Sequence, residues 1–115
     1  MNSLFRLRIK TLLAAGRPGG FPVACDGARV VHWHEFDRLV QARRRQAGSE
    51  RRRVLVADKT ALDFLAHLLA VIADDDVAVI PPNFQPQTLQ SFTTLLPPDG
   101  VPRATLELYT SGSTG

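Results

Sequence analysis

The most regular pattern of apolar and polar positions lies between residues 53 and 109. Three short, mostly apolar runs there, each flanked by proline or charged residues, have the length of buried strands: 53–57, 77–80 and 104–109. Residues 61–73 are apolar nearly all round, so the helix that they predict must be covered on most sides. Another helix is expected to begin at Pro86. This alternation predicts an α/β fold with a mainly parallel sheet and flanking helices.

The first half of the chain follows a different pattern. Its predicted elements are an amphipathic helix, a loop rich in glycine, two strands and a second helix: 4–15, 16–20, 21–25, 29–32 and 34–47. The two strands are expected to form a hairpin, because Asp26-Gly27 between them is a favourable turn. Phe36, Leu39 and Val40 form the apolar stripe of the second helix.

Length and composition indicate one globular unit. The chain has 115 residues, of which 44% are hydrophobic and 22% charged, and this argues against disorder. Its longest apolar run, 68–73, is far shorter than the roughly 20 residues that cross a bilayer. Basic residues interrupt any apolar leader near the N-terminus, and the single cysteine, Cys25, cannot form an internal disulfide. We therefore expect a cytoplasmic protein without a membrane partner; the frequent Arg and Ala are typical of a GC-rich bacterial genome.

Two arginine triplets, Arg43–Arg45 and Arg51–Arg53, concentrate the positive charge of a chain whose formal net charge is +3. Such clusters can contact nucleic-acid phosphates. The first triplet, however, falls in the last turns of a helix expected to end at Gly48, where cations complement the helix dipole. Aromatic residues that could stack on bases are not interleaved with either triplet. The pattern argues against a nucleic-acid partner and keeps a basic interaction domain as a secondary hypothesis.

Two groups of residues could suggest a metal. His32, His34 and Cys25 are close in sequence, but zinc sites normally have tighter paired spacing and four ligands. Asp74–Asp76 could attract magnesium, although acidic residues at a turn before a strand are a commoner arrangement. No metal site is predicted in this chain.

The polar residues of the 61–73 segment have structural interpretations. Thr60 and Asp63 are spaced to initiate the helix in a near capping-box arrangement. His67 is expected to be a packed or edge residue rather than an acid–base catalyst. No catalytic residue can be assigned from the sequence.

The last residues of the chain carry the most specific chemistry. The strand that ends at Tyr109 leads into a segment made of hydroxyl-bearing residues and glycine: Thr110, Ser111, Gly112, Ser113, Thr114 and Gly115. Glycines allow close backbone approach, and consecutive N–H groups with Ser and Thr hydroxyls form a nest for oxyanions. This composition predicts a phosphate loop at the carboxyl end of a strand, where α/β sheets bind ligands. A Walker loop would need wider glycine spacing and a lysine, and dinucleotide or flavodoxin-type loops follow the first strand.

The segment 109–115 resembles the phosphate-loop signature of the adenylate-forming superfamily, which includes acyl- and aryl-CoA synthetases, adenylation domains and luciferases. In that family a Pro-Lys pair follows, which this sequence does not contain. Residues 28–40 resemble an early strand-turn-helix of the family, with His32-Trp33 where a Thr-Trp or Ser-Tyr pair is usual, and 53–82 resemble its strand, buried helix and strand. Glu107 departs from the apolar residue of many members.

The resemblance implies that residues 1–115 are the N-terminal part of an AMP-binding domain, ending at the phosphate loop. The parent protein would be an acyl-CoA synthetase type ligase that uses ATP and Mg to activate a carboxylic acid as acyl-adenylate. Coenzyme A or an acyl-carrier pantetheine would then accept the acyl group. By the same resemblance, the six residues from Thr110 to Gly115 would hold the β- and γ-phosphates, while the magnesium site and most catalytic residues would lie outside this chain.

Two expectations follow for the chain itself. It should not catalyse adenylation, and its unfinished sheet should pair with another copy, as a homodimer, or aggregate. A non-catalytic phosphate- or nucleotide-binding module remains the alternative hypothesis to the ligase.

Overall fold

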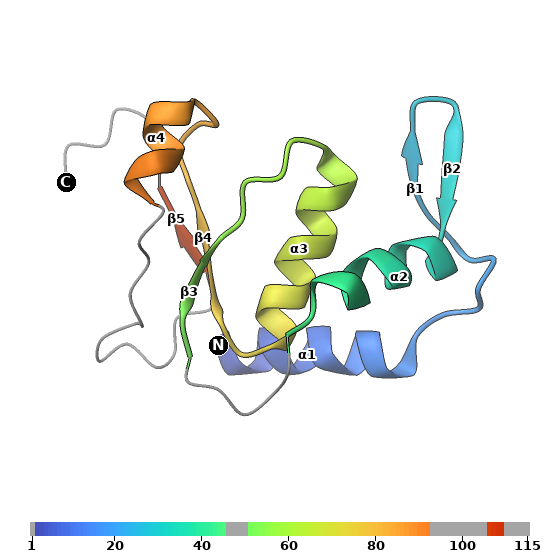
Figure 1. The fold of residues 1–115 in the computed structure, drawn as a ribbon. Helices are drawn as coiled ribbons and strands as arrows, with labels where there is room; N and C mark the ends of the chain where they lie inside the picture. Colours follow the sequence, from blue (N-terminus) through green and yellow to red (C-terminus); the bar gives the residue numbers. More distant parts are fainter. Residues whose placement is uncertain (1, 46–50, 93–105, 110–115) are drawn as a thin grey trace.

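The computed structural model describes residues 2–45, 51–92 and 106–109. Helices and strands follow one another along the chain as α1 (Asn2–Ala15), β1 (Pro22–Asp26), β2 (Arg29–His32), α2 (Trp33–Arg43), β3 (Arg53–Leu55), α3 (Ala61–Ala73), β4 (Val77–Ile80), α4 (Pro86–Ser91) and β5 (Leu106–Leu108). Figure 1 shows this arrangement. The fold combines helices with a small parallel sheet, so the predicted α/β class is confirmed.

The two sheets differ in the relative direction of their strands. Strands β3, β4 and β5 form a three-stranded parallel sheet with β4 in the centre. Strands β1 and β2 form a separate antiparallel hairpin, which lies on the far side of α3 from the parallel sheet (Figure 1). Val79 of β4 is opposite Leu55 of β3 and Glu107 of β5, which sets the register of the parallel sheet. The connections between parallel strands contain α3 and α4, as a parallel sheet requires.

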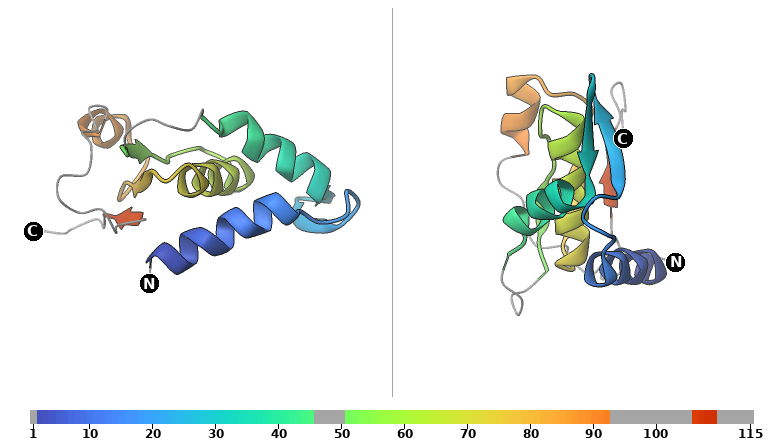
Figure 2. Two further views of the ribbon diagram at one scale, coloured as in Figure 1. Left: turned by 90° about the horizontal axis from the view of Figure 1, so that it is seen from below. Right: turned by 90° about the vertical axis from the view of Figure 1, so that its right-hand side faces the viewer.

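Helix α3 lies between two hydrophobic clusters, which explains why it is apolar on nearly all sides. Ala66, Ala70 and Ala73 face a cluster built from α1, β2 and α2, whose other buried members are Leu13, Val31, Trp33, Phe36 and Val40. On the opposite side, Val71 packs with Val56 and Ala78 of the parallel sheet. The small alanines allow the helices to approach closely. In the left view of Figure 2, α3 lies between α2 above and α1 below, and the strands of the parallel sheet lie to its left.

Local sequence signals explain most helix ends. Gly16 has a φ of +68° directly after α1, a conformation that glycine adopts without strain, and it ends the helix as expected. Thr60 caps α3: its hydroxyl accepts the Asp63 N–H at 3.2 Å, which confirms the predicted helix start. Strand β3 is two residues shorter than predicted and ends at Leu55. The expected strand residues 104 and 105 lie outside the described residues.

No helix in the described part of the chain combines the length and the apolar character that crossing a membrane needs.

Candidate functional site

The carboxyl ends of the three parallel strands meet at one edge of the sheet, called here the carboxyl edge. The chain leaves β3 towards Asp58, leaves β4 towards Phe84 and leaves β5 at Tyr109. This edge lies beside α4 and the first turn of α3 (Figure 1). The Tyr109 N–H donates to the carbonyl of Ile80 at 3.0 Å, so Tyr109 continues the pairing of β5 with β4. Whatever follows Tyr109 therefore begins at the edge where α/β sheets bind ligands.

The residues predicted to bind phosphate follow immediately, but they lie outside the described residues: Thr110, Ser111, Gly112, Ser113, Thr114 and Gly115. The described residues show the strand that leads to them and its surroundings. The predicted strand before them is confirmed over Leu106–Leu108 and pairs in parallel with β4.

Aromatic side chains gather at the carboxyl edge. The rings of Phe92 and Tyr109 meet edge to face, with centroids 5.2 Å apart and an angle of 66° between planes. A second pair, Phe64 of α3 and Phe84 after β4, has centroids 6.5 Å apart. Tyr109 and Phe84 are each 45% exposed despite these contacts. No local sequence pattern predicts this gathering, because the four residues are spread over three parts of the chain.

Glu107, which departs from the resembled family pattern, has an ion-pair partner in this chain. Arg53 of β3 donates from Nε to both carboxylate oxygens of Glu107 at 3.1 Å, across the central strand. Both side chains are about one-fifth exposed. The charge in the middle of β5 is therefore balanced by a strand two positions away in the sheet, which sequence spacing could not indicate.

His67 has a carboxylate partner rather than a purely packed position. Its Nδ1 lies 2.7 Å from Oδ1 of Asp58, and both side chains are mostly buried. Asp58 also forms an ion pair with Arg43 at the end of α2. The carboxylate of Asp58 thus fixes the imidazole ring and joins α2, α3 and the exit of β3. The prediction of a packed or edge residue agrees with the burial of His67, but it missed this partner.

The opposite edge of the sheet begins with a turn made by three aspartates. The N–H groups of Asp75 and Asp76 bond the carbonyls of Ile72 and Val71, both at 3.1 Å, in the pattern of a Schellman motif. Asp75 takes the left-handed position with a φ of 66°, which aspartate tolerates better than most residues. These bonds end α3 and direct the chain into β4, as the prediction of a capping role for Asp74–Asp76 implied.

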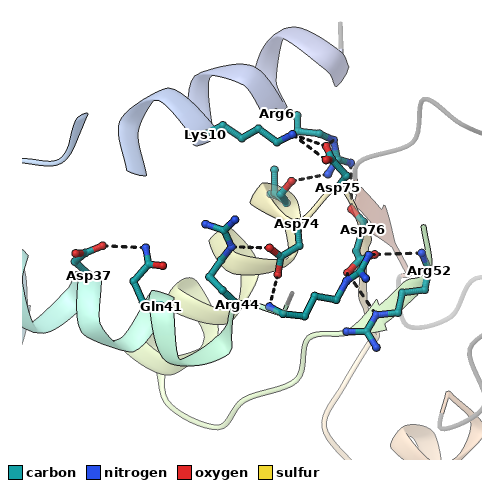
Figure 3. Close-up of polar contacts among 11 residues, drawn as sticks. Arg6, Lys10, Asp37, Gln41, Arg44, Arg52, Asp74, Asp75 and Asp76 are labelled. Atoms are coloured by element: carbon teal, nitrogen blue, oxygen red, sulfur yellow. Dashed lines mark hydrogen bonds and ion pairs between the residues drawn. The ribbon is translucent and has the colours of Figure 1, made fainter. Parts of the chain in front are cut away.

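Basic side chains from α1, from the end of α2 and from the residues before β3 converge on this turn (Figure 3). The ion pairs, which we call the aspartate clasp, are Lys10–Asp75 (2.8 Å), Arg44–Asp74 (2.5 Å), Arg45–Asp76 (2.7 Å) and Arg52–Asp76 (3.4 Å). Asp76 is 1% exposed and accepts bonds from the backbone N–H of Arg52 as well. Its charge is buried but surrounded by donors, which is the condition under which a buried carboxylate is stable.

Two arginines near the three aspartates, Arg6 and Arg45, have shifted pKa values. Arg6 donates to the carbonyls of Ile72 at 2.5 Å and Asp76 at 3.1 Å, and burial lowers the pKa of its guanidinium, with nearby Arg51 adding to the effect. The hydrogen bond to Asp76 raises the pKa of the Arg45 guanidinium.

The clasp corrects one expectation about the first arginine triplet. Helix α2 ends at Arg43, and Arg44 has extended backbone angles (φ −69°, ψ 138°), so Arg44 and Arg45 do not lie in helical turns. The expected helix end at Gly48 lies outside the described residues. Leaving the helix lets both side chains reach Asp74 and Asp76, and these ion pairs outweigh the helix propensity of arginine. The sequence signal for these ion pairs was the presence of an arginine triplet, Arg43–Arg45, and an aspartate triplet, Asp74–Asp76.

The residues considered as metal ligands do not form a metal site among the described residues. The rings of His32 and His34 are stacked with centroids 6.3 Å apart; His34 bonds the carbonyl of Gly19 at 2.8 Å, and His32 lies near Glu35. Cys25 is exposed on β1. Among the residues that the structure describes, no three His, Cys, Asp or Glu side chains gather closely enough to hold a metal ion.

A small cavity of about 150 Å³ opens between the hairpin and the start of α3. Its lining is mainly apolar and includes Cys25, Val31, Leu62 and Leu65. Within the described ranges, every buried side-chain nitrogen or oxygen has a hydrogen-bond partner, so no orphaned polar group marks a ligand there.

Comparison with known proteins adds no assignment. No protein-family model matches the chain, and no curated protein or solved structure gave a significant match.

Proposed function

We propose that this chain is the N-terminal segment of an ATP-dependent acid–thiol ligase of the acyl-CoA synthetase type. The observation that carries the proposal is the direction of β5. Because β5 runs parallel to β4, the hydroxyl- and glycine-rich residues after Tyr109 start at the carboxyl edge of the sheet. Their sequence, Thr110 to Gly115, resembles the phosphate loop of adenylate-forming enzymes.

In the proposed reaction, a carboxylate oxygen attacks the α-phosphorus of ATP. A bond forms between them, and the bond from that phosphorus to the bridging oxygen of the β-phosphate breaks, so pyrophosphate leaves with the electron pair. The loop donates N–H and O–H groups to the β- and γ-phosphates and stabilises the charge that develops on pyrophosphate. A thiol, from coenzyme A or a carrier-protein pantetheine, then displaces AMP from the acyl-adenylate.

The residues of the described segments contribute positioning rather than chemistry. The pairing of Tyr109 with Ile80 and the Arg53–Glu107 ion pair hold the strand from which the loop starts. Asp74–Asp76 are bound by basic side chains and are poorly suited to hold magnesium. The proposed mechanism therefore gives these aspartates no role as metal ligands. We expect the chain alone to bind ATP weakly and not to turn it over.

Binding of ATP to the 115-residue chain tests the proposal. Titration followed by ³¹P NMR should show binding to the parent chain and a loss of affinity of about tenfold or more in the Gly112→Val/Gly115→Val double variant, because valine blocks close backbone approach. Gly20→Val is the matched control, since a side chain at Gly20 would meet no atom within 4 Å. Equal affinity of all three chains would exclude the loop as the ATP site.

Activity distinguishes the ligase from a non-catalytic nucleotide-binding module. If the gene continues beyond Gly115, the complete polypeptide should exchange labelled pyrophosphate into ATP in the presence of its carboxylic acid. ATP binding without such exchange, across a panel of aliphatic and aromatic acids, would support the binding module instead.

A further inference from the structure

The cavity of about 150 Å³ lies between the β1–β2 hairpin and the start of α3, on the side of α3 that is turned away from the parallel sheet (Figure 1). Its walls come from two parts of the chain: Ala24, Cys25 and Val31 of the hairpin, and Thr60, Ala61, Leu62 and Leu65 next to it. We propose that this cavity binds one small, uncharged, apolar molecule of about the size of a benzene ring. The site uses no residue of the proposed phosphate loop.

The inner part of the cavity belongs to the hydrophobic cluster that α1, β2 and α2 form against α3. Val31 is completely buried in that cluster, and Leu62 packs against it. Two other lining residues reach the surface, since Leu65 is 40% exposed and Cys25 is exposed. The cavity therefore has an apolar inner end and a mouth through which a ligand can enter from solvent.

Short side chains on both walls leave the space unfilled. Ala24 on the hairpin wall and Ala61 on the helix wall have no side-chain atom beyond Cβ. Atoms that line an unfilled space lose the dispersion contacts that a close-packed interior provides, and a ligand of matching size restores them. Apolar cavities of about 150 Å³ take up molecules such as benzene or xenon.

The polar groups of the lining indicate that the ligand is uncharged. None of the described lining residues has a charged side chain. The Thr60 hydroxyl accepts the Asp63 N–H at 3.2 Å and donates to the Asp63 carboxylate at 2.8 Å, so its hydrogen is already used. The thiol of Cys25 is only a weak donor. A charged ligand would lose its hydration in the cavity without gaining a partner.

Benzene is the probe for the test, with the full 115-residue chain and methyl NMR. Titration should shift the methyl signals of Val31, Leu62 and Leu65 in a saturable manner, because of the ring current of the bound molecule. The methyl signals of Val56 and Val71, which pack at the parallel sheet, should remain nearly unchanged. Absence of a saturable shift, or equal shifts in both groups of signals, would overturn the proposed site.

A variant that fills the cavity tests its position. Ala24→Leu should weaken benzene binding by about tenfold or more, because the leucine side chain occupies the space and removes contacts with the ligand. Ala14→Leu is the matched control, since it adds the same atoms at an exposed position of α1 and should leave the affinity unchanged. Unchanged affinity in folded Ala24→Leu would overturn the site.

Trp33 fluorescence checks the fold of both variants. Should Ala24→Leu fail to fold, Ala61→Leu replaces it with the same expected loss of affinity, because Ala61 lies on the other wall and is exposed.

Charged molecules of similar size test the ligand class. Benzoate and benzylammonium should cause no saturable shift of the Val31, Leu62 and Leu65 methyl signals, because their charges find no partner in the lining. Binding of either ion at the cavity with the affinity of benzene would overturn the assignment of an uncharged ligand.

Discussion

At the amino edge of the parallel sheet, where Asp74–Asp76 lead into β4, carboxylates and guanidinium groups bond one another, whereas aromatic side chains gather at the carboxyl edge. Asp76 at the amino edge is 1% exposed and is bound by Arg45 and Arg52. Tyr109 at the carboxyl edge is 45% exposed. The same sheet therefore has one end where buried charges are paired and one end where an aromatic side chain stays half exposed.

The same contrast applies to the two arginine triplets, whose charges are paired within the fold. The arginine triplets look like a nucleic-acid patch in the sequence, but Arg43, Arg44, Arg45, Arg52 and Arg53 all have carboxylate partners in the fold. Phosphate contacts would have to compete with these ion pairs. The secondary hypothesis of a basic interaction domain is weakened for this physical reason.

The largest loss of stability is expected when the central carboxylate of the amino edge, that of Asp76, is removed. Asp76→Asn should lower the free energy of unfolding by about 3 kcal/mol, because it leaves the mostly buried Arg45 guanidinium without its anionic partner. Urea unfolding followed by Trp33 fluorescence measures the loss. Asp37→Asn, which affects a solvent-exposed bond to Gln41, is the control and should change stability by less than about 0.5 kcal/mol. A similar small change for Asp76→Asn would mean that the clasp is not structural.

A substitution at the carboxyl edge should cost less. Thr60→Ala removes the hydroxyl that accepts the Asp63 N–H and should lower the free energy of unfolding by about 1 kcal/mol, the usual effect of a lost N-cap. Thr11→Ala, at an exposed position within α1, is the matched control and should be close to neutral. The same urea experiment compares the two. A cost above that of Asp76→Asn would reverse the proposed contrast between the edges.

The smallest effect is expected from an exposed ion pair away from both edges. The Arg29 hydrogen bond, 2.6 Å long, lowers the pKa of the Glu35 carboxyl in the folded chain. A carboxyl with a depressed folded pKa stabilises above the pKa of the unfolded state, about pH 4.3, and this contribution disappears as the pH falls through the folded pKa. Glu35→Gln should therefore lower the urea midpoint slightly at neutral pH and not at about pH 3. Parallel pH profiles of parent and variant would contradict this sign.

Much of the fold could be predicted from local patterns. The helix over 61–73 and the strand over 77–80 were predicted with the residues that the structure gives, because Thr60, Asp74–Asp76 and the prolines after Ile80 mark their ends. The α2 boundary was wrong because Arg44 and Arg45 leave the helix to reach aspartates about 30 positions away. Such bonds depend on distances in space that no local pattern contains.

The candidate site likewise has features that the sequence predicts and features that only the tertiary structure decides. The residues from Thr110 to Gly115 were chosen from the sequence for their donors, and the parallel sheet that leads to them was predicted from the alternation of strands and helices. The tertiary structure alone brought Phe92 against Tyr109, Asp58 to His67 and Arg53 to Glu107. Periodicity and turn chemistry are local properties of the chain, whereas contacts between distant residues are decided by how the elements pack.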